Sequence, residues 1–133
     1  MPVEMPEQSK VDAVWQRVRG SRGKSFAVLA QREQEIMGLS RRLYDLGAHR
    51  PLMKKLYTQA KERRMLLLKM ASLAGEGGCV PPAEHSKAEL GELVRLLGQG
   101  ATEYDPEHPI YGGLFAQFRQ DCVRGQRMLL AAQ

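Results

Sequence analysis

The sequence predicts an all-α fold, and two observations support that prediction. Apolar residues recur every three to four positions through most of the chain, as they do along one face of a helix. No run alternates β-branched and aromatic residues with polar ones, which would indicate a half-buried strand. With 133 residues and 43% hydrophobic content, the chain is long enough for one core and short for two. We therefore expect a single helical bundle.

Two helices are expected in the first third of the chain. A short amphipathic helix over residues 9–19 carries Trp15 on its apolar side. That side needs cover from the bundle or from a second copy, so a homodimer is one expectation. A longer helix over residues 25–47 opens with a serine and closes with a glycine, the residue types that cap helix starts and follow helix ends. The predicted units are an N-terminal helix and loop at 1–24 and a bundle at 25–133.

Three further helices complete the predicted bundle. Pro51 opens the second long helix, because its missing N–H has no intrahelical partner in a first turn. The Gly- and Pro-rich segment 75–85 ends that helix and forms the longest connection. Ser86 and Glu89 match a capping box that starts the third long helix. The last helix is expected to turn these apolar residues inward: Leu114, Phe118, Met128 and Leu129. The predicted layout is two helical hairpins joined by a long crossover.

Charged side chains fall inside the predicted apolar faces of three helices. Glu33, Arg63 and Asp121 are each flanked by apolar residues at helical spacing. Arg124 follows at the margin of the last of these faces. Because burying a charge is costly without a partner, the four residues predict a buried ion-pair network. The alternative is that their long side chains reach past the core edge to water, most readily for Arg124.

The spacing of these residues resembles a pattern of the ferritin-like and rubrerythrin-like proteins, in which an apolar residue, an alanine, a glutamate and a histidine recur. The matching positions are Leu56, Ala60, Arg63 and Leu66 and, in a second copy, Leu114, Phe118, Asp121 and Arg124. Glu33 would stand where the family's first helix supplies a carboxylate ligand. The resemblance implies a ferritin-like four-helix bundle from about residue 25 onward.

The departures from that pattern argue against a metal centre. In the family, carboxylates and histidines from four helices hold two metal ions. Here Arg63 and Arg124 stand at ligand positions, and a guanidinium repels a cation. We therefore expect no metal, no cofactor and no catalytic residue, and the leading hypothesis is a non-catalytic structural or protein-interaction domain. The alternative is a metal carrier or enzyme in which Glu33 and Asp121 bind one ion.

The excess of basic residues leaves a third hypothesis, a weak polyanion-binding helical module. The net charge of +5 and the pI near 9.5 attract polyanions whatever the fold. The candidate anion-binding residues are Arg22, Lys24, Arg41 and Arg42. Aromatic content of 6% disfavours a surface on which nucleic-acid bases stack, so nucleic acid is the weaker expectation for a partner.

Hydropathy and the first residues of the chain predict a cytoplasmic protein. Cys79 and Cys122 have neither the number of a disulfide framework nor the spacing of a zinc site, so we expect free thiols. No apolar run is long enough to span a membrane, and the first residues do not resemble a signal peptide. The three histidines fall in predicted loops or helix starts and are expected at the surface: His49, His85 and His108.

Overall fold

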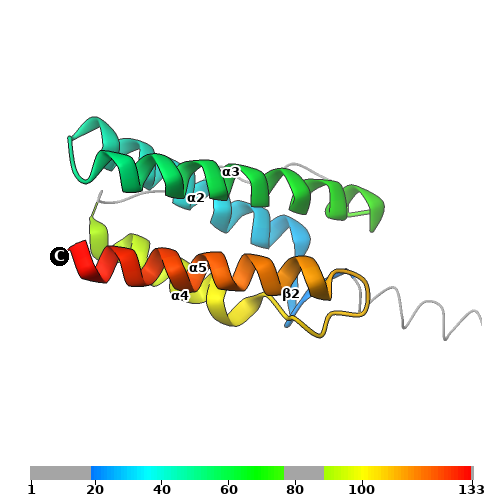
Figure 1. The fold of residues 1–133 in the computed structure, drawn as a ribbon. Helices are drawn as coiled ribbons and strands as arrows, with labels where there is room; N and C mark the ends of the chain where they lie inside the picture. Colours follow the sequence, from blue (N-terminus) through cyan, green and yellow to red (C-terminus); the bar gives the residue numbers. More distant parts are fainter. Residues whose placement is uncertain (1–18, 77–88, 133) are drawn as a thin grey trace, which may run out of the picture.

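The computed structural model describes residues 19–76 and 89–132, which form four helices and a short β-hairpin (Figure 1). The helices are α2 (Phe26–Asp45), α3 (Arg50–Leu73), α4 (Leu90–Glu103) and α5 (Gly112–Ala132). The strands β1 (Gly20–Ser21) and β2 (Lys24–Ser25) pair antiparallel. The predicted all-α class is confirmed. Residues 9–18 of the predicted N-terminal helix and the serine of the predicted capping box lie outside the described residues, while Glu89 is the residue just before α4 and its side chain makes no capping bond, which corrects the predicted box.

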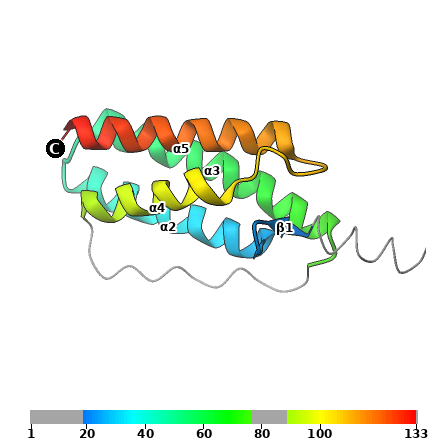
Figure 2. The ribbon, with the colours of Figure 1, turned by 90° about the horizontal axis from the view of Figure 1, so that it is seen from below.

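The four helices pack as two hairpins. α2 packs against α3 and α4 packs against α5, while α2 also contacts α4 and α3 contacts α5. Helices α3 and α4 run in the same direction (Figure 2). The start of α2, the ends of α3 and α4 and the start of α5 therefore meet at one end of the bundle, which also carries the β-hairpin. No helix of the described residues is long and apolar enough to cross a membrane.

The start of α2 is capped from two directions. The Ser25 hydroxyl accepts a hydrogen bond from the backbone N–H of Val28 at 3.2 Å, as the sequence predicts for a helix start. The Glu76 carboxylate, just beyond α3, accepts from the backbone N–H groups of Phe26 and Ala27, at 3.1 Å each. Since α2 has no acidic residue in its own first turn, Glu76 supplies the negative charge that a helix N-terminus favours.

The β-hairpin corrects the expectation that the chain forms no strand. Arg22 and Gly23 at its tip have φ angles of 50° and 79°, the left-handed values that a tight two-residue turn requires. The Ser21 hydroxyl donates to the carbonyl oxygen of Glu103 at 2.6 Å and accepts from the backbone N–H of Asp105 at 2.9 Å. Two-residue strands are too short to produce a periodic pattern in the sequence, which is why the prediction missed them.

The buried face of α5 is rotated from the predicted one. Leu114 and Met128, expected to point inward, are 36% and 37% exposed. Phe118 and Leu129 are buried as predicted, but Phe115 and Cys122 are buried in place of Leu114 and Met128. The two phenylalanine rings pack against each other with their centres 5.8 Å apart. Because aromatic rings bury more apolar area than leucine, they determine which face of the helix turns inward.

Candidate functional site

Five polar and charged side chains lie together inside the bundle, and we call them the core polar cluster. They are Arg32, Glu33, Arg63, Glu103 and Tyr104. Glu33 is 0% exposed and Arg63 is 2% exposed, which is rare for ionised side chains unless they are paired. Members come from α2, α3 and the end of α4, so the cluster connects the two hairpins.

Glu33 is the centre of the cluster. Its Oε2 atom accepts a hydrogen bond from Nε of Arg63 at 2.8 Å, and its Oε1 atom accepts from the Tyr104 hydroxyl at 2.6 Å. Hydrogen bonds to an ionised acceptor are shorter and stronger than those between neutral groups. Both oxygens of the buried carboxylate are therefore held by side chains of other helices.

Arg32 extends the cluster from Tyr104 toward the end of α4. Its guanidinium carbon lies 5.0 Å from the centre of the Tyr104 ring, within cation–π range, and it forms an ion pair with Glu103. Two arginines thus face two glutamates, and the cluster is electrically neutral. This neutrality offsets part of the cost of removing four charges from water.

The cluster shifts the pKa values of its own members. Burial alone lowers the pKa of Arg63, but the attraction of Glu33, aided by Cys122, Tyr104 and the hydrogen bond, outweighs it and raises that pKa. Burial raises the pKa of Tyr104 well above its usual 10.0, and the charge of Glu33 adds to this effect. The guanidinium therefore stays charged, and the phenol stays protonated as a donor to Glu33.

The cluster has more hydrogen-bond donors than acceptors. Nη1 and Nη2 of Arg63, and Nε and Nη2 of Arg32, have no hydrogen-bond partner among the described residues. Cys122 lies nearby and is fully buried; burial raises the pKa of its thiol to about 12, with Arg63 acting in the opposite direction. Each oxygen of Glu33 accepts one hydrogen bond, and the two guanidinium groups of the cluster repel a cation.

Only two of the four residues predicted for a buried network belong to the cluster. Glu33 and Arg63 are buried and paired. Asp121 is half-buried and accepts a hydrogen bond from Gln117 of its own helix at 3.4 Å. Arg124, placed at the margin of the buried face by the prediction, is exposed. The rotated face of α5 explains both differences.

Sequence reasoning missed the other three members of the cluster. Arg32 precedes Glu33 directly, so a helical wheel places it at the edge of the apolar face of α2. Tyr104 and Glu103 stand where α4 ends, beyond the reach of a periodic pattern. A buried tyrosine hydroxyl and a buried arginine both need partners, but nothing local identifies which partners they find.

The predicted anion-binding residues do not gather at one site. Arg22 donates to the carbonyl oxygen of Thr102 at 2.9 Å and lies 3.7 Å from the Asp105 carboxylate, with the exposed Lys24 nearby in the hairpin. Arg41 and Arg42 lie near the opposite end of α2. The candidates therefore form two separate basic patches, one at each end of α2.

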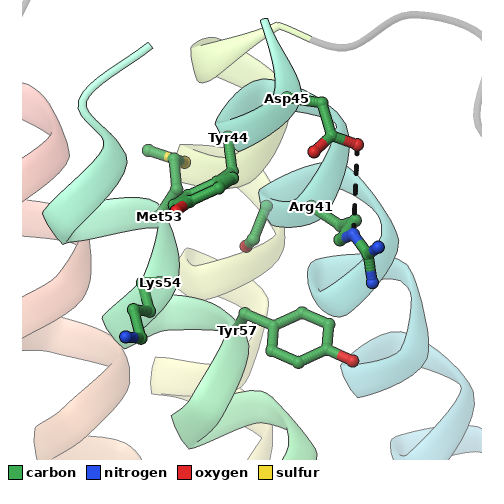
Figure 3. A pocket seen from close by; sticks show the side chains of 7 residues that line it. Arg41, Tyr44, Asp45, Met53, Lys54 and Tyr57 are labelled. Carbon is green, nitrogen blue, oxygen red and sulfur yellow. Dashed lines mark ion pairs between the residues drawn. The ribbon is translucent and has the colours of Figure 1, made fainter. Parts of the chain in front are cut away.

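Arg41 lines a pocket of about 250 Å³ between α2 and α3 (Figure 3). The lining residues are Ser40, Arg41, Tyr44, Asp45, Met53, Lys54 and Tyr57. The Arg41 guanidinium lies 3.9 Å from the Asp45 carboxylate, so its charge is already partly compensated (Figure 3). Lys54 is the other cation of the pocket and forms no ion pair with a described residue, so the pocket keeps a net positive charge.

The histidines correct a second expectation. His108, predicted at the surface, is buried at the β-hairpin end of the bundle among aromatic rings. Its Nδ1 atom accepts hydrogen bonds from the backbone N–H groups of Ile110 at 3.1 Å and Tyr111 at 3.0 Å. The histidine therefore shapes the loop before α5. His49 is exposed at the start of α3, as predicted, and His85 lies outside the described residues.

Metal chemistry finds no support in the part of the chain that the structure describes. Among residues 19–76 and 89–132, no three histidine, cysteine, aspartate or glutamate side chains gather as metal ligands would. Comparisons with protein-family models, curated proteins and solved structures found no match. The contacts, burial and charges of the core polar cluster are therefore the observations that bear on function.

Proposed function

We propose that this chain is a non-catalytic, ferritin-like structural or protein-interaction domain in which buried ion pairs stand where relatives would bind metal. The single observation that carries the proposal is the 2.8 Å ion pair between Arg63 and Glu33 inside the bundle. The arrangement of two hairpins with α3 and α4 running in the same direction supports the ferritin-like assignment. The spacing resemblance of the two motifs adds to it.

The chemistry of the cluster suits a scaffold better than a reaction centre. A metal ion in place of Arg63 would need several carboxylate, imidazole or thiolate ligands, and among the described residues no three such side chains gather around one point. The fully buried Cys122 has a pKa near 12, so it carries a protonated thiol at neutral pH and is a poor nucleophile. The cluster can fix the relative position of the two hairpins, because its buried charges form their hydrogen bonds and ion pairs only when the hairpins are docked in this arrangement.

Metal analysis tests the proposal. Tag-free protein purified without chelator would be incubated with Fe²⁺, Mn²⁺ or Zn²⁺, desalted and measured by inductively coupled plasma mass spectrometry. We expect less than about a tenth of an equivalent of any metal. One equivalent of metal that is lost in Glu33→Gln but kept in Glu35→Gln, a half-exposed carboxylate of the same helix, would overturn the proposal.

The predicted homodimer belongs to the same proposal and has its own test. The prediction of a dimer comes from the apolar side of the predicted helix at 9–19, of which residues 9–18 lie outside the described part of the chain. Light scattering coupled to gel filtration over a wide concentration range should give the mass of two chains. A mass of one chain at the highest concentration would reject the dimer and leave the assignment of the core polar cluster unaffected.

A further inference from the structure

The bundle separates its charges between two layers. α3 and α5 form one layer and α2 and α4 form the other (Figure 1). Apart from Arg50, which contacts Tyr44 of α2, the exposed and half-exposed cations of the first layer are Lys54, Lys55, Lys61, Arg64, Lys69, Arg119, Arg124 and Arg127, and we call them the cationic layer. The only carboxylates on these two helices are Glu62 and Asp121. Such an imbalance creates a positive potential over this side of the molecule.

The two layers also differ in how their cations are paired. No residue of the cationic layer forms an ion pair with any described residue. In the other layer most arginines are paired, namely Arg32 with Glu103, Arg41 with Asp45 and Arg95 with Glu92. Positive charges left without partners along two neighbouring helices repel one another, so a polyanionic partner would relieve that repulsion.

Exposed apolar side chains lie on the same two helices as these cations. They are Met65, Leu73, Leu114, Met128 and Leu130, with Leu73 at 74% and Leu130 at 54% exposed. Basic residues mixed with exposed leucine and methionine are typical of protein faces that lie in the interface of an anionic bilayer. The cations attract the lipid phosphates, and the apolar side chains enter the boundary of the acyl chains.

We propose that the cationic layer docks this protein on an anionic lipid surface, with α3 and α5 lying along the headgroups. Nucleic acid suits the layer less well. The aromatic residues of α3 and α5 are Tyr57, Phe115 and Phe118, of which only Tyr57 is partly exposed, so the layer presents no series of rings on which successive bases could stack. The exposed leucines and methionines would gain no apolar contact from a phosphodiester backbone. The docking proposal does not depend on the core polar cluster.

Vesicle flotation with the full chain tests the docking. The vesicles would be phosphatidylcholine alone or phosphatidylcholine with about 30% phosphatidylglycerol, at low and at high salt. We expect binding to the anionic vesicles only, with a marked loss at high salt because salt screens the attraction. Absence of binding to anionic vesicles at low salt would overturn the proposal.

Matched charge reversals locate the binding surface. The double variant Lys61→Glu/Arg124→Glu changes two residues of the cationic layer, and Lys24→Glu/Arg42→Glu makes the same change at exposed, unpaired cations outside it. We expect the first to weaken vesicle binding at least about tenfold and the second to change it less than about twofold. Circular dichroism and thermal melting verify that both variants fold. Equal losses in the two variants would mean that only net charge matters, which contradicts the proposal.

A third variant separates lipid from nucleic acid. Met65→Ser/Leu73→Ser leaves every charge in place and removes apolar contact area. Vesicle binding should fall severalfold, whereas binding to a phosphate backbone would not change. Unchanged vesicle binding in this variant, or binding of wild-type protein to duplex DNA without binding to vesicles, would overturn the assignment to lipid.

Discussion

Tyr104 donates a 2.6 Å hydrogen bond to Glu33 in the core although 71 residues separate them in sequence. The bond connects the residue that ends α4 with the middle of α2, and so it joins one helical hairpin to the other. Because the donor stays protonated and the acceptor stays buried, the bond depends on how closely the hairpins dock.

Replacing the tyrosine should weaken this docking. Tyr104→Phe leaves Oε1 of Glu33 without its donor, and we expect a loss of about 1–3 kcal/mol in the free energy of unfolding, the usual cost of an unsatisfied buried group. Urea denaturation measures it. Tyr57→Phe is the control, because that half-buried tyrosine makes no hydrogen bond with its hydroxyl among the described residues. Equal effects of the two substitutions would contradict the role assigned to Tyr104.

The ion pair between Arg63 and Glu33 should show strong coupling. Either single change, Glu33→Leu or Arg63→Met, leaves one charge buried without its partner, and each should cost about 3–5 kcal/mol. The double variant replaces the pair with apolar side chains and should lose far less than the sum of the singles. A double-mutant cycle from chemical denaturation gives the coupling energy. Additive losses would show that the two side chains act independently.

Gly100 should tolerate no side chain beside Cys122. A Cβ atom at Gly100 would lie 2.7 Å from Sγ of Cys122, whereas one at Gly91 of the same helix meets nothing within 4 Å. We expect Gly100→Ala to destabilise by about 1–3 kcal/mol through overpacking, and Gly91→Ala to be neutral or to stabilise by up to about 1 kcal/mol. Thermal melting checks both. Adding Cys122→Ala should recover part of the Gly100→Ala loss, and failure to do so would assign the loss to another contact.

The Cys122 thiol should make the protein less stable at high pH. Its pKa is near 12 in the folded protein against 9.0 for an ordinary thiol, so between these values the unfolded chain releases a proton that the folded one keeps. The free energy of unfolding must therefore fall as pH rises from 9 toward 12, and the raised pKa of Tyr104 acts in the same direction. In Cys122→Ala the fall should be shallower. Denaturation curves across this pH range compare the two slopes, and equal slopes would contradict the assignment.

The Glu76 carboxylate should stabilise a helix to which it does not belong. Glu76→Ala removes the acceptor for two backbone N–H groups at the start of α2 and should cost about 1–2 kcal/mol. Glu62→Ala, at an exposed carboxylate in the middle of α3, is the control and should change stability by less than about 0.5 kcal/mol. Amide hydrogen exchange should also show faster opening at Phe26 and Ala27. Unchanged exchange at Phe26 and Ala27 would show that Glu76 does not stabilise the start of α2.

Local signals in the sequence predicted the first two described helices well. Ser25 caps α2, and Gly47 and Gly75 have positive φ angles just beyond the ends of α2 and α3, so these limits depend on neighbours in sequence. The inward positions of Glu33 and Arg63 follow from the same helical periodicity. These features are predictable because each is decided within one or two turns of helix.

The sequence did not predict the features that depend on contacts between helices. The inward face of α5 depends on where the Phe115 ring packs against Phe26 of the other hairpin and the Phe118 ring against Tyr104, and the apolar pattern of the sequence favoured a different rotation. Tyr104 lies beyond the end of α4, so the helical periodicity of apolar residues does not predict its burial. The charge difference between the layers is visible only once helices distant in sequence are known to be neighbours.

The two bonds of the Ser21 hydroxyl bear on where this protein can be shortened or fused. A truncated chain that starts at Phe26 keeps every described helix but deprives the Glu103 carbonyl and the Asp105 amide of their partner. The end of α4 would then fray, and with it the segment that presents Tyr104 to the interior. Fusion partners and affinity tags are therefore best attached ahead of residue 19, where the β-hairpin stays intact.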